Sequence, residues 1–402
     1  MENKYTKYLN YCFVGYALSL PLSKAGISIF EASIFLLWLL EANWKNKFNL
    51  INNNLLSISI LLFIAYNIIS ILWANTMIDG LAYIQRYKHL LIVLVLYTSL
   101  KKEYIQYLFS AFLLSMFLSE IVSYGIFFEW WHYKNVLPSD PSPFMSHIDY
   151  SILLSFVSML LLNRFFNQKN NTRARLFYII FFITVTANLF INGGKTGQIA
   201  FIILLLINIF FNIKNKIKAF LIFCSILFTT AFLAYNFSPT FQKRTLEFKN
   251  DIVQMVIKKQ YNGTLSIRVA LWTIGLENFK QHPIIGIGIG NEMQEKNVQY
   301  ALKKHDITCN VAMNYKDSHN TFMTTLSQHG IIGLFMILFI FYAVVTLQFN
   351  TANYRTLNLL FFTSFIIWSM GNTTLHTMNA LVYFALFAGI FNRVSKLEES
   401  KN

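Results

Sequence analysis

The sequence predicts an all-α, polytopic integral membrane protein, and three observations support this fold class. Of the 402 residues, 55% are hydrophobic and only 13% are charged, whereas a soluble domain usually carries about 25% charged residues. The 40 Phe, 21 Tyr and 7 Trp are more aromatic surface than one soluble core can bury. Long apolar runs recur from residue 8 to residue 394, and they lack the alternating ten-residue pattern of a transmembrane barrel.

Twelve of these runs can cross, or nearly cross, a hydrocarbon core of about 30 Å, which takes roughly 20 helical residues. The first run reaches Pro21 and Ser23 without a small-residue cleavage motif, so we expect a retained helix and not a signal peptide. The sequence therefore predicts about 12 transmembrane helices, near residues 8–22, 26–43, 54–74, 83–100, 104–128, 148–166, 176–191, 197–212, 218–237, 319–348, 356–373 and 378–393.

Lys and Arg are distributed unevenly among the connections between these runs. With a cytoplasmic N-terminus, 17 of them lie in the cytoplasmic connections and termini, and five lie in the short connections opposite. The positive-inside rule thus predicts that both termini are cytoplasmic. We expect transmembrane helices 1–9 in residues 1–237, one large outer loop with short helices in residues 238–318, and helices 10–12 with a cytoplasmic tail in residues 319–402.

Several kinds of chemistry find no support in the sequence. The outer loop has no H-E-x-x-H motif, carboxylate cluster or Cys/His ligand set, so we expect no metal site and no cofactor. "GIGIGN" lacks the G-x-G-x-x-G spacing and follows a helical segment, so we interpret it as a turn. The net charge of +15 mostly reflects topology, so we expect no nucleic-acid partner. We interpret Cys12, Cys224 and Cys309 as unpaired structural residues.

His319 lies where the long polar region ends and an apolar run begins, in "DSHNTFMTTLSQHGIIGLF". We expect Asp317 or Ser318 to cap the tenth span, which places His319 in its first helical turn. The positive end of a helix favours a neutral imidazole, and a neutral imidazole can act as a general base. An interfacial histidine without chemistry is the alternative interpretation.

Two cations accompany this histidine on the outer side. Lys195 interrupts the apolar pattern in "NGGKTG", and Arg268 lies near the start of a helix that Thr264 or Ser266 can cap and that ends before Pro283. Cations beside a neutral base would suit a lipid-linked phosphate. Each cation taken alone is equally consistent with a solvated interfacial residue.

Three stretches resemble the O-antigen ligase and polymerase superfamily in this order around the large loop: "NGGKTGQIAFIILLL", "RVALWTIGLENFKQHPIIGIGIG" and "SHNTFMTTLSQHGIIGLF". The resemblance covers residues 190–340, and the N-terminal half matches only in span count and hydropathy. It implies that Arg268 and His319 are catalytic, with Arg268 the main diphosphate ligand and His319 the base. Lys195 stands where the family usually has arginine, and Arg244 matches a weaker loop arginine.

The resemblance implies a bacterial inner-membrane enzyme with a periplasmic active site and no cofactor. Its donor would be an undecaprenyl-diphosphate-linked glycan, its acceptor the lipid A core, and membrane lipids its surroundings. The alternatives are a repeat-unit polymerase, a protein O-oligosaccharyltransferase and, in another class, a transporter or flippase. Glu120 is the one clear deep charge that a transporter would need.

Further polar residues are candidates for the same site. Arg86 could reach the diphosphate from the fourth span. His147 and Asp149 flank the sixth span on the outer side, where either could bind the acceptor or cap the helix. Trp272 lies one turn after Arg268 on the same helical face, and Asn320 forms a His-Asn pair with His319; both are possible acceptor-binding residues.

Overall fold

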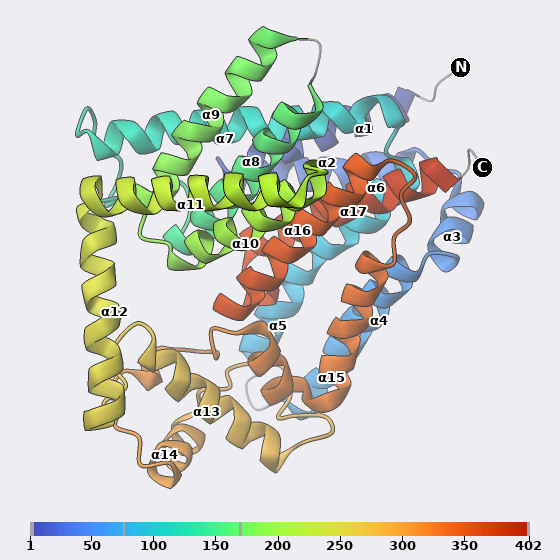
Figure 1. Cartoon of the computed structure of the whole chain (residues 1–402). Coiled ribbons are helices and arrows are strands. Elements are labelled where there is room, and N and C mark those ends of the chain that lie inside the picture. Colours follow the sequence, from blue (N-terminus) through green and yellow to red (C-terminus); the bar gives the residue numbers. More distant parts are fainter. Residues whose placement is uncertain (1–3, 75–76, 169–170, 400–402) are drawn as a thin grey trace.

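The computed structural model describes residues 4–74, 77–168 and 171–399, and the regular elements in these segments are helical. Figure 1 shows their arrangement. The α-helices are α1 (Lys4–Ser19), α2 (Lys24–Leu40), α3 (Trp44–Asn52), α4 (Leu55–Ile69), α5 (Met77–Arg86), α6 (Ile92–Ser99), α7 (Ile105–Phe127), α8 (His147–Asn167), α9 (Thr172–Ile191), α10 (Lys195–Asn212), α11 (Lys216–Phe237), α12 (Pro239–Lys258), α13 (Ser266–Gln281), α14 (Glu295–Lys304), α15 (Thr321–Val345), α16 (Ala352–Gly371) and α17 (Met378–Glu399).

The all-helical membrane fold is confirmed, whereas the count of twelve spans is not. Among the described residues, eight helical segments are long and apolar enough to cross a membrane, or nine if α2 and α3, bent by 114°, form one broken span. The run at 83–100 is divided by a 3-10 helix, η2 (Tyr87–Leu91), and α1 has only 16 residues. The first turns of α16 carry Asn353, Arg355 and Asn358, which lower its hydropathy.

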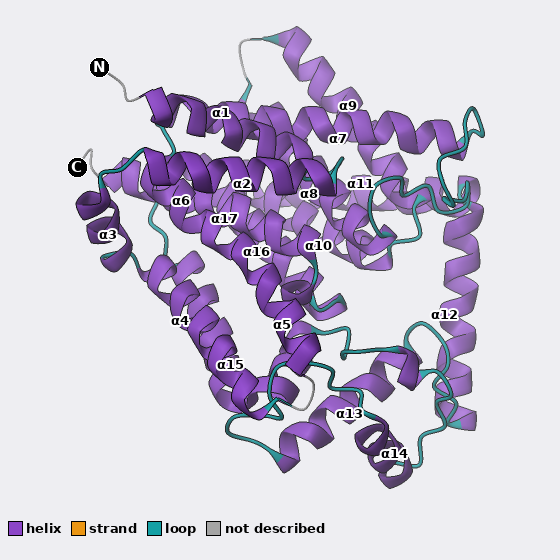
Figure 2. Cartoon of the chain, turned by 180° about the vertical axis from the view of Figure 1, so that it is seen from behind, coloured by secondary structure: helices purple, strands orange, loops and turns teal. Residues whose placement is uncertain are grey.

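The centre of the bundle is formed by α8 and α17. In each of them 83% of the most apolar window is buried inside the protein, compared with 11% for α11. A helix that is apolar all round is buried in the protein or faces lipid, so α11 is a peripheral, lipid-facing helix. In both ribbon views α1 begins and α17 ends at one end of the molecule, away from α13 and α14 (Figures 1 and 2).

The segment between α11 and α15 contains α12, α13 and α14. Ser238 separates α11 from α12: its hydroxyl accepts the Phe241 N–H at 3.1 Å and donates to the Phe190 carbonyl at 2.9 Å, and Pro239 follows at the first helical position. Helix α12 then forms the outer edge of the molecule (Figure 1).

Neither Thr264 nor Ser266 caps α13, which corrects the expected cap. The residue at the cap position is Leu265, and the Asp251 carboxylate of α12 accepts the backbone N–H groups of Leu265 at 2.6 Å and Ser266 at 3.2 Å. A carboxylate is a strong acceptor at the positive end of a helix. A Cβ atom at Gly263 would lie 2.1 Å from Asp251 Oδ1, so this contact requires glycine there.

The turn at "PIIGIG" packs on a break in α15. Gly330 has φ 59° and ψ −157° inside this helix, and its neighbour Ile331 donates to the Pro283 carbonyl at 2.9 Å. Gly286 and Gly288 have positive φ angles of 67° and 86°, which favour glycine. The turn therefore ties the end of α13 to α15. The contact lies within α15, about ten residues after its N-terminus.

Candidate functional site

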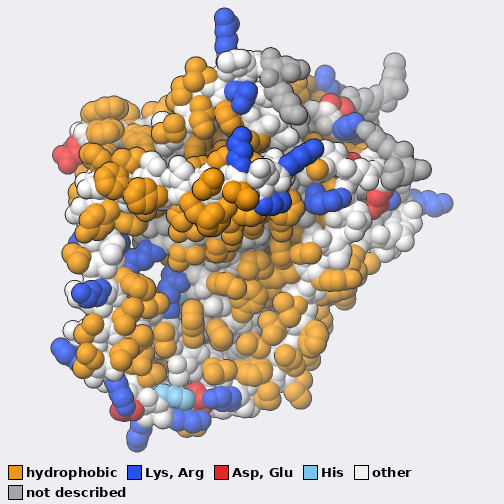
Figure 3. Space-filling view, viewed as in Figure 1, with side chains coloured by type: hydrophobic (Ala, Val, Ile, Leu, Met, Phe, Trp, Pro, Cys, Tyr) orange, Lys and Arg blue, Asp and Glu red, His pale blue; other side chains and the backbone are white. Residues whose placement is uncertain are grey.

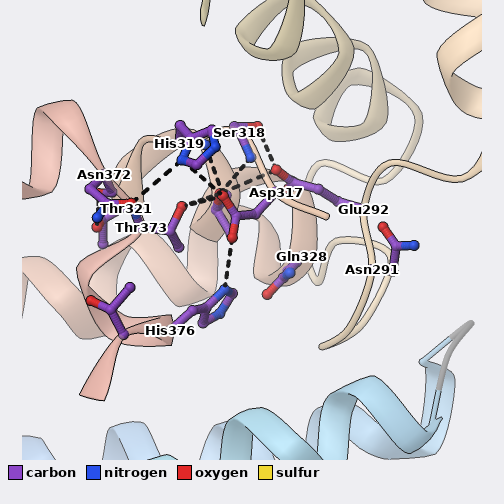
Figure 4. Close-up of polar contacts among 12 residues, drawn as sticks. Asn291, Glu292, Asp317, Ser318, His319, Thr321, Gln328, Asn372, Thr373 and His376 are labelled. Atoms are coloured by element: carbon purple, nitrogen blue, oxygen red, sulfur yellow. Dashed lines mark hydrogen bonds and ion pairs between the residues drawn. The ribbon is translucent and has the colours of Figure 1, made fainter. Parts of the chain in front are cut away.

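The site is built around the connection between α16 and α17, residues 371–376, which we call the 371–376 turn. It ends in a 3-10 helix, η5 (Thr374–His376), and it lies against the start of α15 (Figure 4). The Thr321 hydroxyl donates to the Asn372 carbonyl at 3.0 Å and accepts the Thr374 N–H at 2.9 Å. These two bonds fix the turn to the first residue of α15.

His319 lies immediately before the helix cap and not in the first turn of the helix, which corrects the expectation. Asn320 is the N-cap: its side-chain oxygen accepts the N–H groups of Phe322 at 2.9 Å and Met323 at 3.2 Å. His319 itself has φ 47°, an uncommon left-handed conformation for a residue other than glycine, and its backbone N–H bonds to Asp317 Oδ1 at 2.9 Å. This backbone turn directs the imidazole away from the helix axis.

The imidazole of His319 is partly open to solvent, with 34% of its side chain exposed. Its Nδ1 lies 3.5 Å from Asn372 Oδ1 and 4.0 Å from Asp317 Oδ1, and the Tyr315 ring meets it edge-on at 5.0 Å. Because Nδ1 faces these two oxygens, Nε2 is the nitrogen left for an external hydroxyl.

Asp317 is the central anion of this cluster (Figure 4). Its Oδ1 accepts the Thr373 hydroxyl at 2.7 Å, and its Oδ2 lies 3.8 Å from Nδ1 of His376. Burial alone would raise the pKa of the Asp317 carboxyl, but His376, His319 and the Thr373 hydroxyl outweigh it and hold the pKa at about 2. Asp317 is therefore a carboxylate at neutral pH.

A second carboxyl, Glu292, is buried beside the first. Its Oε1 accepts the hydroxyls of Ser318 and of Thr324, the latter at 3.1 Å, and its Oε2 is buried without a hydrogen-bond partner in the protein. Burial raises the pKa of Glu292 to about 7, although the Ser318 bond lowers it, and the negative charge of Asp317 adds to the rise.

Arg268 and Lys195 are brought to the same side of the 371–376 turn. Arg268 Nη1 donates to the Gly371 carbonyl at 2.6 Å. Gly371 in turn packs on α10, since a Cβ atom there would lie 2.9 Å from Thr196 Oγ1. The neighbouring Lys195 reaches towards α13, where its Nζ lies 3.3 Å from Thr264 Oγ1.

Arg244 joins these cations from α12. It forms an ion pair with Glu247 at 3.3 Å and packs against Gly193 in the loop that precedes Lys195. Arg244 and Arg268 are both near enough for their charges to act on Lys195. In the space-filling view, Lys and Arg side chains line a recess between α12 and the bundle (Figure 3). A cavity of 390 Å³ lies next to these cations, and it is lined by Arg244, Glu247, Asn250, Asp251, Gln254, Gln260, Asn262, Gly263 and Thr264.

Arg86 lies at the opposite end of the 371–376 turn from Arg268. Its Nη1 donates to the His376 carbonyl oxygen, and the His376 ring stacks on Tyr83 with centroids 3.8 Å apart. The two predicted arginines therefore hold the two ends of one turn through its backbone carbonyls. Arg86 thus reaches the neighbourhood of Asp317, but from the side of His376.

The four possible acceptor-binding residues have different surroundings. His147 pairs with Asp140, Nδ1 to Oδ2 at 3.0 Å, and Asp140 also accepts the Gly193 N–H at 3.1 Å. Asp149 is buried and accepts the Asn379 amide at 3.0 Å. Ser146 caps α8, so the capping alternative for His147 and Asp149 is wrong.

The other two possible acceptor-binding residues are Trp272 and Asn320. Trp272 has a buried indole N–H with no hydrogen-bond partner in the protein. Asn320 has both ends of its amide engaged, since its nitrogen donates to the Met370 carbonyl at 3.2 Å while its oxygen caps α15. Trp272 therefore keeps an unpartnered side-chain donor, and Asn320 keeps the second N–H of its amide.

The sequence analysis missed the 371–376 turn, with Thr373 and His376, and it missed Glu292. A signal for the turn was present, because "GNTTLH" is a polar run containing a histidine between the eleventh and twelfth runs. With a cytoplasmic N-terminus this connection falls on the same side as the large loop. Glu292 left no comparable signal, since an acidic residue in a polar loop is ordinarily solvated. In the described parts of the chain, no three His, Cys, Asp or Glu side chains gather as metal ligands.

These apolar helices define a multi-pass membrane protein, in which Arg268 and His319 meet at one turn. Residues 179–338 match a family model described as O-antigen ligase. This segment, about two fifths of the chain, is therefore similar to the O-antigen ligase family. No curated protein matches the chain.

The matched segment runs from within α9 to within α15. It contains Lys195, Arg244, Arg268 and His319, whereas Arg86 and the 371–376 turn lie outside it. The family match and the geometry therefore agree on these four residues, and the geometry adds Arg86 and the 371–376 turn.

Proposed function

We propose that the chain is an inner-membrane glycosyltransferase that transfers an undecaprenyl-diphosphate-linked O-antigen glycan to a lipid A-core acceptor. The observation that carries this proposal is that Arg268 and His319 both bond to the 371–376 turn, while Lys195 lies within electrostatic reach of Arg268 and Arg244. A diphosphate carries several negative charges, and this set of three cations suits such a donor head group.

In the proposed reaction Arg268 is the main diphosphate ligand. Its guanidinium donates one N–H to the Gly371 carbonyl, and its remaining N–H groups can donate to phosphate oxygens in fork geometry. Lys195 adds a point charge from α10, and Arg244 adds a second guanidinium from α12. Arg86 bonds to the His376 end of the 371–376 turn, opposite the end that Arg268 holds. We therefore propose that Arg86 holds the turn in place.

His319 is the proposed general base. The acceptor hydroxyl attacks the anomeric carbon and gives its proton to His319 Nε2, while the lipid diphosphate leaves from the opposite face. Direct displacement of this kind inverts the anomeric configuration. A diphosphate held by cations is a good leaving group, so the proposal requires neither a metal ion nor a nucleotide cofactor.

The orientation in the membrane is part of the proposal. We place both termini in the cytoplasm and residues 238–318 in the periplasm, since 17 Lys and Arg fall on the former side and five on the short connections of the latter. Reporter fusions after Glu399 and within the segment between α12 and α13 test this. Reporter activity on the same side of the membrane for both fusions would contradict it.

A repeat-unit polymerase is the second candidate, because the matched family contains ligases and polymerases. Its donor chemistry would be identical, and the acceptor would be a second lipid-linked chain. Protein O-glycosylation remains a third possibility for the acceptor. Gene deletion followed by gel analysis of surface polysaccharide and lipid carrier separates these outcomes.

Complete polymer accumulating on the lipid carrier, with none on the lipid A core, would support the ligase. Single repeat units on the core would support the polymerase. Loss of glycan from a protein with unchanged lipopolysaccharide would support protein glycosylation. Unchanged glycans in all three fractions would contradict the proposed enzyme class, and a transporter assay would then be the next measurement.

A further inference from the structure

The Asp317 carboxylate lies between two imidazole rings that come from different parts of the chain. His319 Nδ1 is 4.0 Å from Oδ1, and His376 Nδ1 is 3.8 Å from Oδ2. Figure 4 shows the two rings on opposite sides of the carboxylate. Both distances exceed a direct hydrogen bond but permit Coulombic coupling, which solvent screens more at the partly exposed His319 than at the buried His376.

The carboxylate is held in this position by groups other than the two rings. Oδ1 accepts the Thr373 hydroxyl at 2.7 Å and the His319 backbone N–H at 2.9 Å. These two donors come from the two sides of the cluster, so the carboxylate cannot turn without breaking both. Only 18% of the Asp317 side chain is exposed.

His376 is even more tightly enclosed. Its side chain is 5% exposed, its ring stacks on Tyr83 at an interplanar angle of 9°, and its carbonyl is bonded by Arg86. Its Nδ1 has no hydrogen-bond partner in the protein. Such a ring cannot reach a substrate, and it can act only through Asp317.

We propose that Asp317 and His376 are positioning residues for His319: the carboxylate is the counter-charge of the imidazolium that forms when His319 takes a proton, and His376 competes for that carboxylate. The inference rests on the proposed function, since it assigns roles around the proposed base. Asp317 lies inside the segment that carries the family match, and His376 lies outside it.

The proton balance of the step is simple. The acceptor O–H bond breaks, its oxygen bonds to the anomeric carbon, and the bond from that carbon to the diphosphate oxygen breaks with its electron pair. The proton goes to His319 Nε2, which makes the ring a cation. Asp317 stabilises this cation without itself receiving the proton, and water later takes the proton away.

Other charged groups face the cluster and are common to every variant described below. Glu292 lies beside Asp317 from the loop before α14, and Arg86 and Tyr83 face it from α5. Arg268 reaches the far end of the 371–376 turn from α13, and Tyr315 borders His319 on its own segment. Lys316 is paired with Asp79 at 2.8 Å.

The two positioning residues predict shifts of opposite sign in the pH dependence of transfer. Asp317→Asn removes the counter-charge, so the imidazolium becomes less favourable and the acid limb of kcat moves to lower pH, by about one pH unit or more. Transfer should also slow about tenfold to a hundredfold, a part of what a general base contributes. His376→Gln removes the competitor, so the acid limb moves to higher pH.

The experiment measures kcat and donor KM from pH 5 to 9 for the full-length protein in vesicles, with purified lipid-linked glycan and acceptor. Asp306→Asn is the matched control, because it makes the same change on an exposed carboxylate that is paired with Lys259. Asp317→Glu tests rescue, since it restores the charge with a longer side chain. We expect a donor KM close to wild type for Asp317→Asn and an unshifted profile for Asp306→Asn.

Two results would overturn the inference. One is an unshifted acid limb in Asp317→Asn together with a lower kcat, which would indicate a structural role only. The other is a shift in the same direction for Asp317→Asn and His376→Gln. If the wild-type protein transferred no glycan to the lipid A core, to a second lipid-linked chain or to a protein, the proposed function would be refuted. Failure of the inference and failure of the proposed function therefore give different results.

Discussion

Arg268 Nη1 lies 2.6 Å from the carbonyl oxygen of Gly371, so the first turn of α13 is bonded to the end of α16, more than a hundred residues later in the chain. The bond fixes the 371–376 turn to α13. Thr321 fixes the same turn to the start of α15, and Thr373 in the turn donates to Asp317. The proposed diphosphate ligand and the proposed base are thus set by one structural element.

Replacing Arg268 should therefore weaken donor use in a graded way. Arg268→Lys keeps the charge but loses the fork, and we expect about a tenfold loss of donor kcat/KM. Arg268→Ala also leaves the Gly371 carbonyl without its donor, so we expect about a hundredfold loss, since bonds to charged groups are worth about 1.5–3 kcal/mol. A donor titration with each variant checks this, and unchanged donor dependence in both would exclude a diphosphate contact.

Lys195 provides a test of charge against shape. If its ammonium binds a phosphate oxygen, Lys195→Gln should cost roughly tenfold to a hundredfold in donor efficiency, while Lys195→Arg should retain most of it. Thr264→Val is a useful companion, because it removes the 3.3 Å contact of Lys195 but leaves the charge in place. Equal donor efficiency for wild type and Lys195→Gln would show that the lysine only anchors α10 at the interface.

His319→Ala should abolish transfer while the protein stays folded and inserted. The side chain is partly exposed and its one hydrogen bond, to Asn372, is long at 3.5 Å, so its removal should change the thermal unfolding midpoint little. The measurement is single-turnover transfer by purified protein, with unfolding followed in the same detergent. Wild-type transfer by the variant would remove His319 as the base.

The sequence predicted candidate site residues that lie within a single motif. It did not predict contacts between segments that are far apart in the chain. Lys195, Arg268 and His319 each lie in a short polar interruption of an apolar pattern, and the structure brings them around one turn. The cap of α15 was misassigned because Asp317 and Asn320 are both good capping residues. In the structure the Asp317 carboxylate accepts the Thr373 hydroxyl of the 371–376 turn, and Asn320 caps the helix.

The span count failed for a similar physical reason. Hydropathy reports whether a run can be buried, not whether it stays in one helix. The run at 83–100 is interrupted by η2, where Tyr87 and Leu90 are buried inside the protein and not exposed to lipid. α16 is long enough to span but begins with polar residues. Burial against other helices can thus replace burial in lipid, and a single-segment hydropathy rule cannot distinguish them.

The last prediction concerns the buried carboxyl of Glu292 and the stability of the fold. Its folded pKa is raised to about 7 by burial, against an ordinary value of 4.5 in the unfolded chain. The folded state therefore binds the proton more tightly. The stability linked to this proton is fully present below pH 4.5 and is lost as pH rises through 7, which amounts to roughly 3 kcal/mol at most.

Glu292→Gln should remove this dependence. The amide oxygen can still accept the Ser318 and Thr324 hydroxyls, so the variant should unfold near the wild-type temperature at pH 5 and at a higher temperature at pH 8. Glu277→Gln is the control of opposite sign. Hydrogen bonds from Lys280 and Lys304, both 2.7 Å, lower the pKa of Glu277 to about 2, so its contribution is present above pH 4.5 and lost as pH falls towards 2.

The test is thermal unfolding of wild type, Glu292→Gln and Glu277→Gln in one detergent at pH 5 and pH 8. It shows whether the two carboxyls contribute to stability with opposite pH dependence. We expect Glu277→Gln to be less stable than wild type at pH 8, where Glu292→Gln is more stable. If Glu292→Gln instead destabilises the protein equally at both pH values, Glu292 is not held as a neutral acid in the fold. In that case its unpartnered Oε2 would have to be solvated by water, and the cluster around Asp317 would carry one more negative charge at neutral pH.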